Sequence, residues 1–134
     1  MSLLVVDTDV VSYIFKGHPS AEVFLDIIED NEPVISFMTR AELRLGARAA
    51  NWGPRRMATL EDHLARYGIC FTDEELCNLW AEVMLDALRS GHSINGQDAW
   101  IAATALYLNA PLVTNNVKHF KHLRGLTVLP SAGL

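Results

Sequence analysis

Three carboxylates, those of Asp7, Glu42 and Asp98, each lie at the edge of an apolar or helix-forming segment, in the contexts LLVVDTD, ISFMTRAEL and INGQDAWIAATA. Carboxylate oxygens are the ligands that hard divalent cations such as Mg²⁺ prefer. A cation held by such groups can activate water and polarise a phosphate group. If the fold brings the three acids together, the chain carries a site suited to hydrolysing phosphodiesters.

Length and composition set the class of protein. The chain has 134 residues, of which 50% are hydrophobic, enough for one well-buried core but short for two. No apolar run approaches the about 20 residues that span a bilayer, and the N-terminus lacks the pattern of a signal peptide. We therefore expect one domain over residues 1–134, cytoplasmic and without membrane contact. Cys70 and Cys77 lack metal-ligand spacing, and we expect them to be reduced and buried.

Charge is distributed unevenly. The net charge is −5, which argues weakly against binding nucleic acid through overall positive charge. No acid follows Asp98, and Lys118, Lys121 and Arg124 give that segment +3, which leaves −8 on residues 1–98. A basic end beside an acidic body suits an enzyme that meets a polyanion, but charge alone favours a solvated basic face. The histidines, including His119, show no spacing typical of a zinc site.

Apolar runs of strand length alternate with amphipathic helical segments. We expect strands at 3–6, 33–37, 69–71, 111–114 and 127–129. We expect helices at about 8–16, 22–30, 39–50, 54–67, 74–90 and 97–108, the first capped within Asp7-Thr8-Asp9 and the third by Thr39. This order predicts a three-layer α/β/α fold, with a mainly parallel central sheet of four to five short strands and helices on both faces.

Parallel sheets bind ligands beyond the carboxyl ends of their strands. Asp7 ends the first expected strand and Thr114 the fourth, while Glu42 and Asp98 fall in the first turns of helices. Carboxylates converging there repel one another, so a cation must neutralise them or their pKa values must rise. The simpler alternatives are that Asp7 and Asp98 only cap helices, and that Glu42 is a solvated helix acid.

With these motifs in series, the chain resembles PIN domains of the bacterial VapC type, the ribonuclease half of a toxin–antitoxin pair. The resemblance runs nearly end to end, through VVDTDVVSYIF, ISFMTRAELRLG, QDAWIAATAL and APLVTNNVKHFKHLRGLTVL. It implies a single PIN domain that acts as a Mg²⁺- or Mn²⁺-dependent endoribonuclease on tRNA or rRNA. It also implies a homodimer, and a hetero-oligomer with a cognate VapB-type antitoxin.

The resemblance also implies roles for residues. The family's acidic metal ligands correspond to Asp7, Glu42 and Asp98, and its fourth position, often Asp, corresponds to Asn116, where this chain departs from the pattern. Asp9 could assist through water and Thr114 could position a carboxylate or a bound water. Contacts to RNA phosphates are expected from four basic residues, Arg40, Arg44, Lys118 and Lys121.

Two other functions remain open at this stage. The opening hydrophobic-DxD pattern also resembles haloacid-dehalogenase-like phosphatases, whose first Asp is a nucleophile; that fold needs a later acidic pair, and no acid follows Asp98. A PIN-like RNA- or protein-binding module with weak or no catalysis is the other alternative, made plausible by Asn116.

Overall fold

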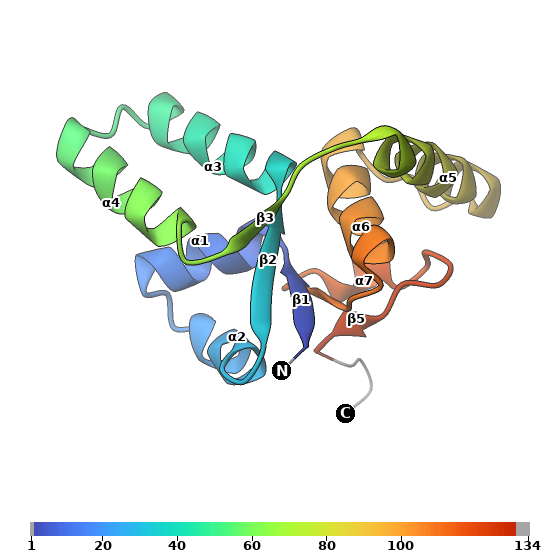
Figure 1. The fold of residues 1–134 in the computed structure, drawn as a ribbon, viewed down its shortest axis with the longest axis horizontal. Coiled ribbons are helices and arrows are strands. Elements are labelled where there is room, and N and C mark those ends of the chain that lie inside the picture. The colour runs from blue at the N-terminus through green and yellow to red at the C-terminus, as the bar shows by residue number, and fades with distance from the viewer. Residues whose placement is uncertain (1, 131–134) are drawn as a thin grey trace.

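A five-stranded, entirely parallel sheet forms the centre of the molecule (Figure 1). The structure is a computed structural model that describes residues 2–130. The spatial order of the strands is β3-β2-β1-β4-β5, and their bounds are β1 Leu3–Val6, β2 Glu32–Ser36, β3 Gly68–Cys70, β4 Leu112–Val113 and β5 Val128–Leu129. The predicted α/β class is confirmed, and the sheet is parallel throughout.

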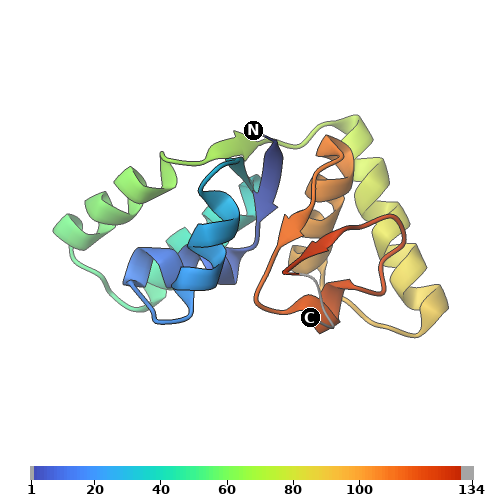
Figure 2. The ribbon, with the colours of Figure 1, turned by 90° about the horizontal axis from the view of Figure 1, so that it is seen from below.

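Helices cover both faces of this sheet. The described residues form seven helices, α1 Thr8–Lys16, α2 Ala21–Ile28, α3 Phe37–Ala49, α4 Pro54–Leu64, α5 Glu74–Ser90, α6 Gly96–Leu108 and α7 Val117–Phe120. Helices α1 to α4 lie on one side of the strands and α5 to α7 on the other, as Figures 1 and 2 both show. This is the predicted three-layer arrangement.

The pleat of the central strands explains why two cores form. Side chains alternate between the faces of a strand: Val5 and Leu112 pack against α5 and α6, whereas Val6 and Val113 pack against the helices of the other side. All four are completely buried. A strand covered on both faces must be apolar at every position, and the run LLVV has that character.

Helix α6 packs closely on the sheet because its buried face is made of small residues. Ala99, Ala102 and Ala103 have no exposed surface, and α6 contacts β1, β2 and the neighbouring α5. This close packing fixes the first turn of α6, which carries Asp98, near the carboxyl ends of the strands.

Several predicted boundaries and caps were wrong. Thr39 does not cap α3; the Ser36 hydroxyl accepts a hydrogen bond of 3.0 Å from the Met38 N–H, and the helix begins immediately after β2. Helix α7 was not predicted. Cys77 is exposed, because it lies on the outer face of α5, whereas Cys70 is buried; both are free thiols, as predicted. Within residues 2–130 no helix has the length and apolar character needed to cross a membrane.

Candidate active site

Asp7 lies directly after β1 and is almost fully buried, with 5% of its surface exposed. It is the N-cap of α1, and its Oδ1 accepts a hydrogen bond of 2.8 Å from the Thr8 N–H. The Thr114 hydroxyl donates to Oδ2 at 2.7 Å, and the Asp7 N–H donates to the Val113 carbonyl at 2.9 Å. The carboxylate is thus held where the ends of β1 and β4 meet. Capping and a chemical role are compatible, because each oxygen still has a free lone pair.

Glu42 reaches the same region from α3, which starts where β2 ends. The Thr8 hydroxyl donates a hydrogen bond of 2.9 Å to Glu42 Oε1, and the same hydroxyl lies 2.9 Å from the Thr39 hydroxyl. Thr39 is completely buried, and its hydroxyl contacts Thr8 rather than capping the helix. Thr8 therefore orients Glu42, with Thr39 in contact with Thr8, and neither threonine was predicted to have this role.

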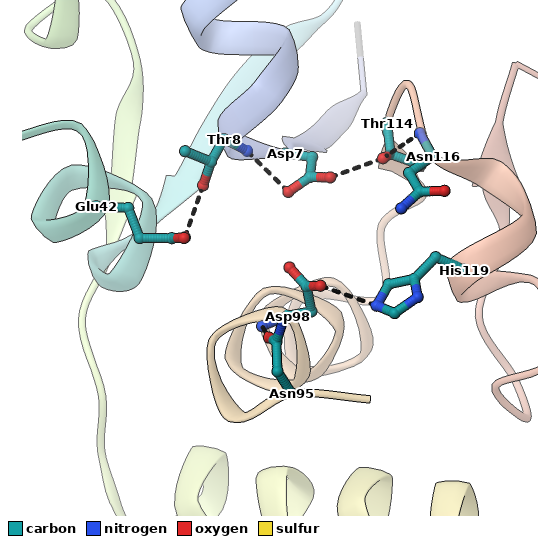
Figure 3. Close-up of polar contacts among 8 residues, drawn as sticks. All are labelled: Asp7, Thr8, Glu42, Asn95, Asp98, Thr114, Asn116 and His119. Atoms are coloured by element: carbon teal, nitrogen blue, oxygen red, sulfur yellow. Dashed lines mark hydrogen bonds and ion pairs between the residues drawn. The ribbon is translucent and has the colours of Figure 1, made fainter. Parts of the chain in front are cut away.

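Asp98 comes from the opposite layer. The Asn95 side chain caps α6 by accepting a hydrogen bond of 2.8 Å from the Asp98 N–H, so Asp98 is not the cap and its own carboxylate is available. Its Oδ2 lies 2.9 Å from Nε2 of His119, on α7. Figure 3 shows Asp7, Glu42 and Asp98 pointing into one shared space, from three different elements.

Burial and mutual repulsion disfavour the charged forms of the carboxyl groups around this space. Burial, reinforced by the neighbouring Asp9 and Asp98 and opposed by the Thr114 hydrogen bond, raises the pKa of Asp7 to about 8. Burial likewise raises the pKa of Asp9, and that of Glu42, above their ordinary values. Asp9 Oδ1 is shielded from solvent and has no hydrogen-bond partner among the described residues. A cation bound between these carboxylates would stabilise their charged forms.

The acids do not already form a closed metal cage. Among residues 2–130, no three His, Cys, Asp or Glu side chains are close enough to hold one ion together. The assignment of Asp7, Glu42 and Asp98 as metal ligands therefore stays a prediction.

Thr114 and Asn116 follow β4 and border the same space. Thr114 is completely buried, donates to Asp7, and accepts a hydrogen bond of 3.0 Å from the Asn116 N–H. The Asn116 side chain makes no capping hydrogen bond to α7 and points toward the acids in Figure 3. Asn116 is thus placed beside the site, as the sequence suggested, although its role is untested.

The four predicted phosphate contacts separate into two pairs. Arg44 donates two hydrogen bonds to Glu61 on α4, of 3.0 and 2.7 Å, and these bonds lower the pKa of Glu61, helped by Arg40. Arg40 and Arg44 are each two residues from Glu42, about 200° around the helix, so they face away from the acids. Lys118 and Lys121, by contrast, are exposed on the α7 segment that borders the site.

The main residue that sequence reasoning missed is His119. Its contact with Asp98 joins positions 21 residues apart in the chain, and the histidines have no ligand spacing to signal it. The only available signal is position: His119 follows Thr114 by five residues, within the segment that leaves the end of β4.

Comparison with known proteins gives a consistent result. The family model of the PIN domain matches residues 4–126. A curated relative, "Ribonuclease VapC1" of Haemophilus influenzae strain R2866, is 30% identical over 126 residues, which cover 92% of this chain and 94% of that protein.

Two solved structures have closely similar folds. One, titled as VapBC2 from Rickettsia felis bound to a DNA fragment from their promoter, has a TM-score of 0.82 at 26% identity and covers 94% of this chain and 96% of that chain. The other, VapBC-1 from nontypeable Haemophilus influenzae, has a TM-score of 0.78 at 29% identity, with 96% of each chain covered.

Proposed function

This chain belongs to the PIN domain family, with VapC ribonucleases among its relatives. From that premise we propose that the protein is a divalent-metal-dependent endoribonuclease and the toxin of a VapBC-type module. The observation that carries the proposal is the convergence of Asp7, Glu42 and Asp98 on one space, with the pKa of Asp7 raised to about 8. Family membership also removes the phosphatase alternative, because the match spans residues 4–126.

The residues fit a hard cation. All candidate donors are oxygens, burial raises the pKa of Asp7 and that of Glu42, and Asp9 contributes a buried oxygen without a hydrogen-bond partner among residues 2–130. Mg²⁺ retains several waters and commonly uses only one or two protein carboxylates, which suits acids that converge without forming a closed cage. We assign Asp7 and Asp98 as direct ligands and Glu42 as a ligand or a partner of bound water. When bound, the cation supplies an activated water and screens charge on the phosphate.

The chain's own groups then orient the reaction, an in-line attack of water on an RNA phosphate. Thr114 holds the Asp7 carboxylate by a hydrogen bond, and Thr8 binds one Glu42 oxygen, while the other Glu42 oxygen has no hydrogen bond to residues 2–130. We assign that second oxygen to accept a proton from the attacking water, and the raised pKa of Glu42 brings its basicity closer to neutral pH. We assign Asn116 and Lys118 to contacts with phosphate oxygens.

We propose that a segment of a VapB-type antitoxin inhibits the site formed by these acids, since the two solved structures compared above are titled as VapBC complexes. A cavity of about 280 Å³ between α1, α3 and α4 has Glu42 among its lining residues, which also include Phe15, Leu43, Trp52 and Leu60. Lys16 and Arg56 also line it. An apolar groove that reaches a catalytic acid suits an amphipathic peptide.

The test is cleavage of a bacterial RNA pool containing tRNA and ribosomes, with Mg²⁺, Mn²⁺ or EDTA, beside Asp7→Asn and Asp98→Asn. Discrete fragments that require metal and are absent with both variants are expected. Identical RNA patterns for the protein and its variants under every metal would instead support the non-catalytic binding module. In that event Asn116→Asp separates the causes: a large gain in cleavage indicates a weakened active site, and no gain indicates a binding module.

A further inference from the structure

Each carboxylate of the site has its own side-chain partner from a neighbouring element. Thr114 donates to Asp7, and Thr8 donates to Glu42. For Asp98, the side-chain contact found among residues 2–130 is His119, whose Nε2 lies 2.9 Å from Oδ2. Asp98 thus differs from the other two acids in resting against an imidazole.

We propose that His119 is a positioning residue that fixes the Asp98 carboxylate, leaving its other oxygen directed at the divalent cation. The proposal rests on the metal-dependent function proposed above. In this role His119 completes the site from α7, at a point where Asn116 provides only a neutral amide.

The surroundings of His119 hold its ring in place. The backbone N–H of His119 donates to the Asn116 carbonyl at 3.0 Å, and the His119 ring packs edge-on against Phe120, with centroids 5.2 Å apart; Phe120 itself is 1% exposed. The backbone of Asn116 is in turn tied to Thr114. The segment from Thr114 to His119 therefore contacts Asp7 at one end and Asp98 at the other, and links carboxylates from two layers of the fold.

The contact is a short approach of Nε2 to the Asp98 oxygen rather than a straight hydrogen bond. His119 Nε2 is shielded from solvent and has no hydrogen-bond partner of good geometry among the described residues. A buried polar nitrogen in that position costs free energy unless a partner compensates, and the Asp98 oxygen at 2.9 Å is the partner the structure offers. Carboxylates that bind metals are commonly held by such partners, whose loss lowers metal affinity or activity about 10- to 100-fold.

The experiment compares His119→Leu, which removes the ring nitrogen that contacts Asp98, with His119→Gln, whose side-chain amide N–H reaches nearly the same point as Nε2. His122→Leu is the matched control, because His122 is exposed in the same segment and stacks on His92, away from the acids. Mn²⁺ binding is measured by electron paramagnetic resonance, RNA cleavage by kcat and KM, and folding by Tm.

We expect His119→Leu to weaken Mn²⁺ binding about 10- to 100-fold and to lower kcat, with KM for RNA little changed. His119→Gln should restore Mn²⁺ affinity to within a few-fold of the parent protein, and His122→Leu should match the parent. Equal Mn²⁺ affinities for His119→Leu and His119→Gln, or no Mn²⁺ binding by the parent protein, would overturn the proposal. The expected Mn²⁺ pattern without any RNA cleavage would support the role of His119 and refute the nuclease function.

Discussion

The hydroxyl of Thr114 donates a hydrogen bond of 2.7 Å to Oδ2 of Asp7, across 107 positions of the chain. Both side chains are buried, at 0% and 5% exposure, so no solvent competes for this contact. The bond joins the ends of β1 and β4, and it lowers the pKa of Asp7 against the effect of burial.

Replacing Thr114 with Val should therefore damage the site while keeping its shape. The substitution removes the hydroxyl that stabilises the charged form of Asp7, so the pKa of Asp7 rises further and less of it is ionised at neutral pH. We expect Mn²⁺ affinity and kcat to fall about tenfold, measured by metal titration and by RNA cleavage. Thr114→Ser, which retains the hydroxyl, serves as the control; the idea is wrong if the Val and Ser variants behave alike.

Asp7→Asn should stabilise the protein when metal is absent. The pKa of Asp7 is raised from 3.8 to about 8 in the folded state, so between these values the unfolded chain binds fewer protons, and the free energy of unfolding falls as pH rises. Asn caps helices as well as Asp does. In EDTA at pH 8 we expect a gain of at least about 1 kcal/mol, on the order of 4 °C in Tm, which shrinks toward pH 4.

Metal should reverse that comparison. Added Mn²⁺ binds the folded parent protein and raises its Tm, whereas Asp7→Asn, with one ligand removed, should gain much less. Thermal melts of both proteins with EDTA and with Mn²⁺ provide the check. A lower Tm for Asp7→Asn than for the parent protein in EDTA at pH 8 would show that the charged form of Asp7 does not destabilise the folded protein.

The sequence predicted the site best where local signals and topology agree. An apolar run followed at once by Asp7 marks the end of a buried strand and the start of a helix, and the structure has that transition. The prediction of the residue that caps α3 was wrong because Ser36 and Thr39 are both good capping residues. What decides between them is the pairing of Ser36 with Cys70 on β3, which ends β2 at Ser36, and a single sequence does not show that pairing.

Helix α7 and the contact of His119 with Asp98 were not predicted, for a related reason. Four residues are too few for a helical period to be visible, and Phe120 is held in this short helix by burial against the core, a tertiary effect. The position of Arg44, by contrast, was predictable: residues two apart on a helix do not share a face, so Glu42 at the site implies Arg44 away from it.

His63 should make stability depend on pH near neutrality. Burial lowers its pKa below the ordinary 6.5, so the unfolded chain takes up a proton before the folded protein does. The contribution of neutral His63 to the free energy of unfolding is therefore fully present above pH 6.5 and is lost as pH falls through the lowered pKa. Between pH 7.5 and 5.5 the parent protein should lose a few degrees more of Tm than His63→Gln, as measured by circular dichroism. Equal losses would mean that His63 is not the group responsible.

Gly46 offers a way to block the proposed antitoxin groove without disturbing the fold. It lies in α3 and lines the cavity that also includes Leu43, and, apart from its chain neighbours and the backbone of its own helix, a Cβ at this position would meet no atom within 4 Å. The helix should therefore tolerate a larger side chain, and its stability should rise because glycine has a low helix propensity.

We expect Gly46→Gln to weaken binding of the cognate antitoxin at least about tenfold, a cost of roughly 1.4 kcal/mol, while RNA cleavage by the free protein is retained. Gly46→Ala, too small to fill the groove, should bind as the parent does. Unchanged affinity of Gly46→Gln in isothermal titration would place the antitoxin elsewhere on the surface.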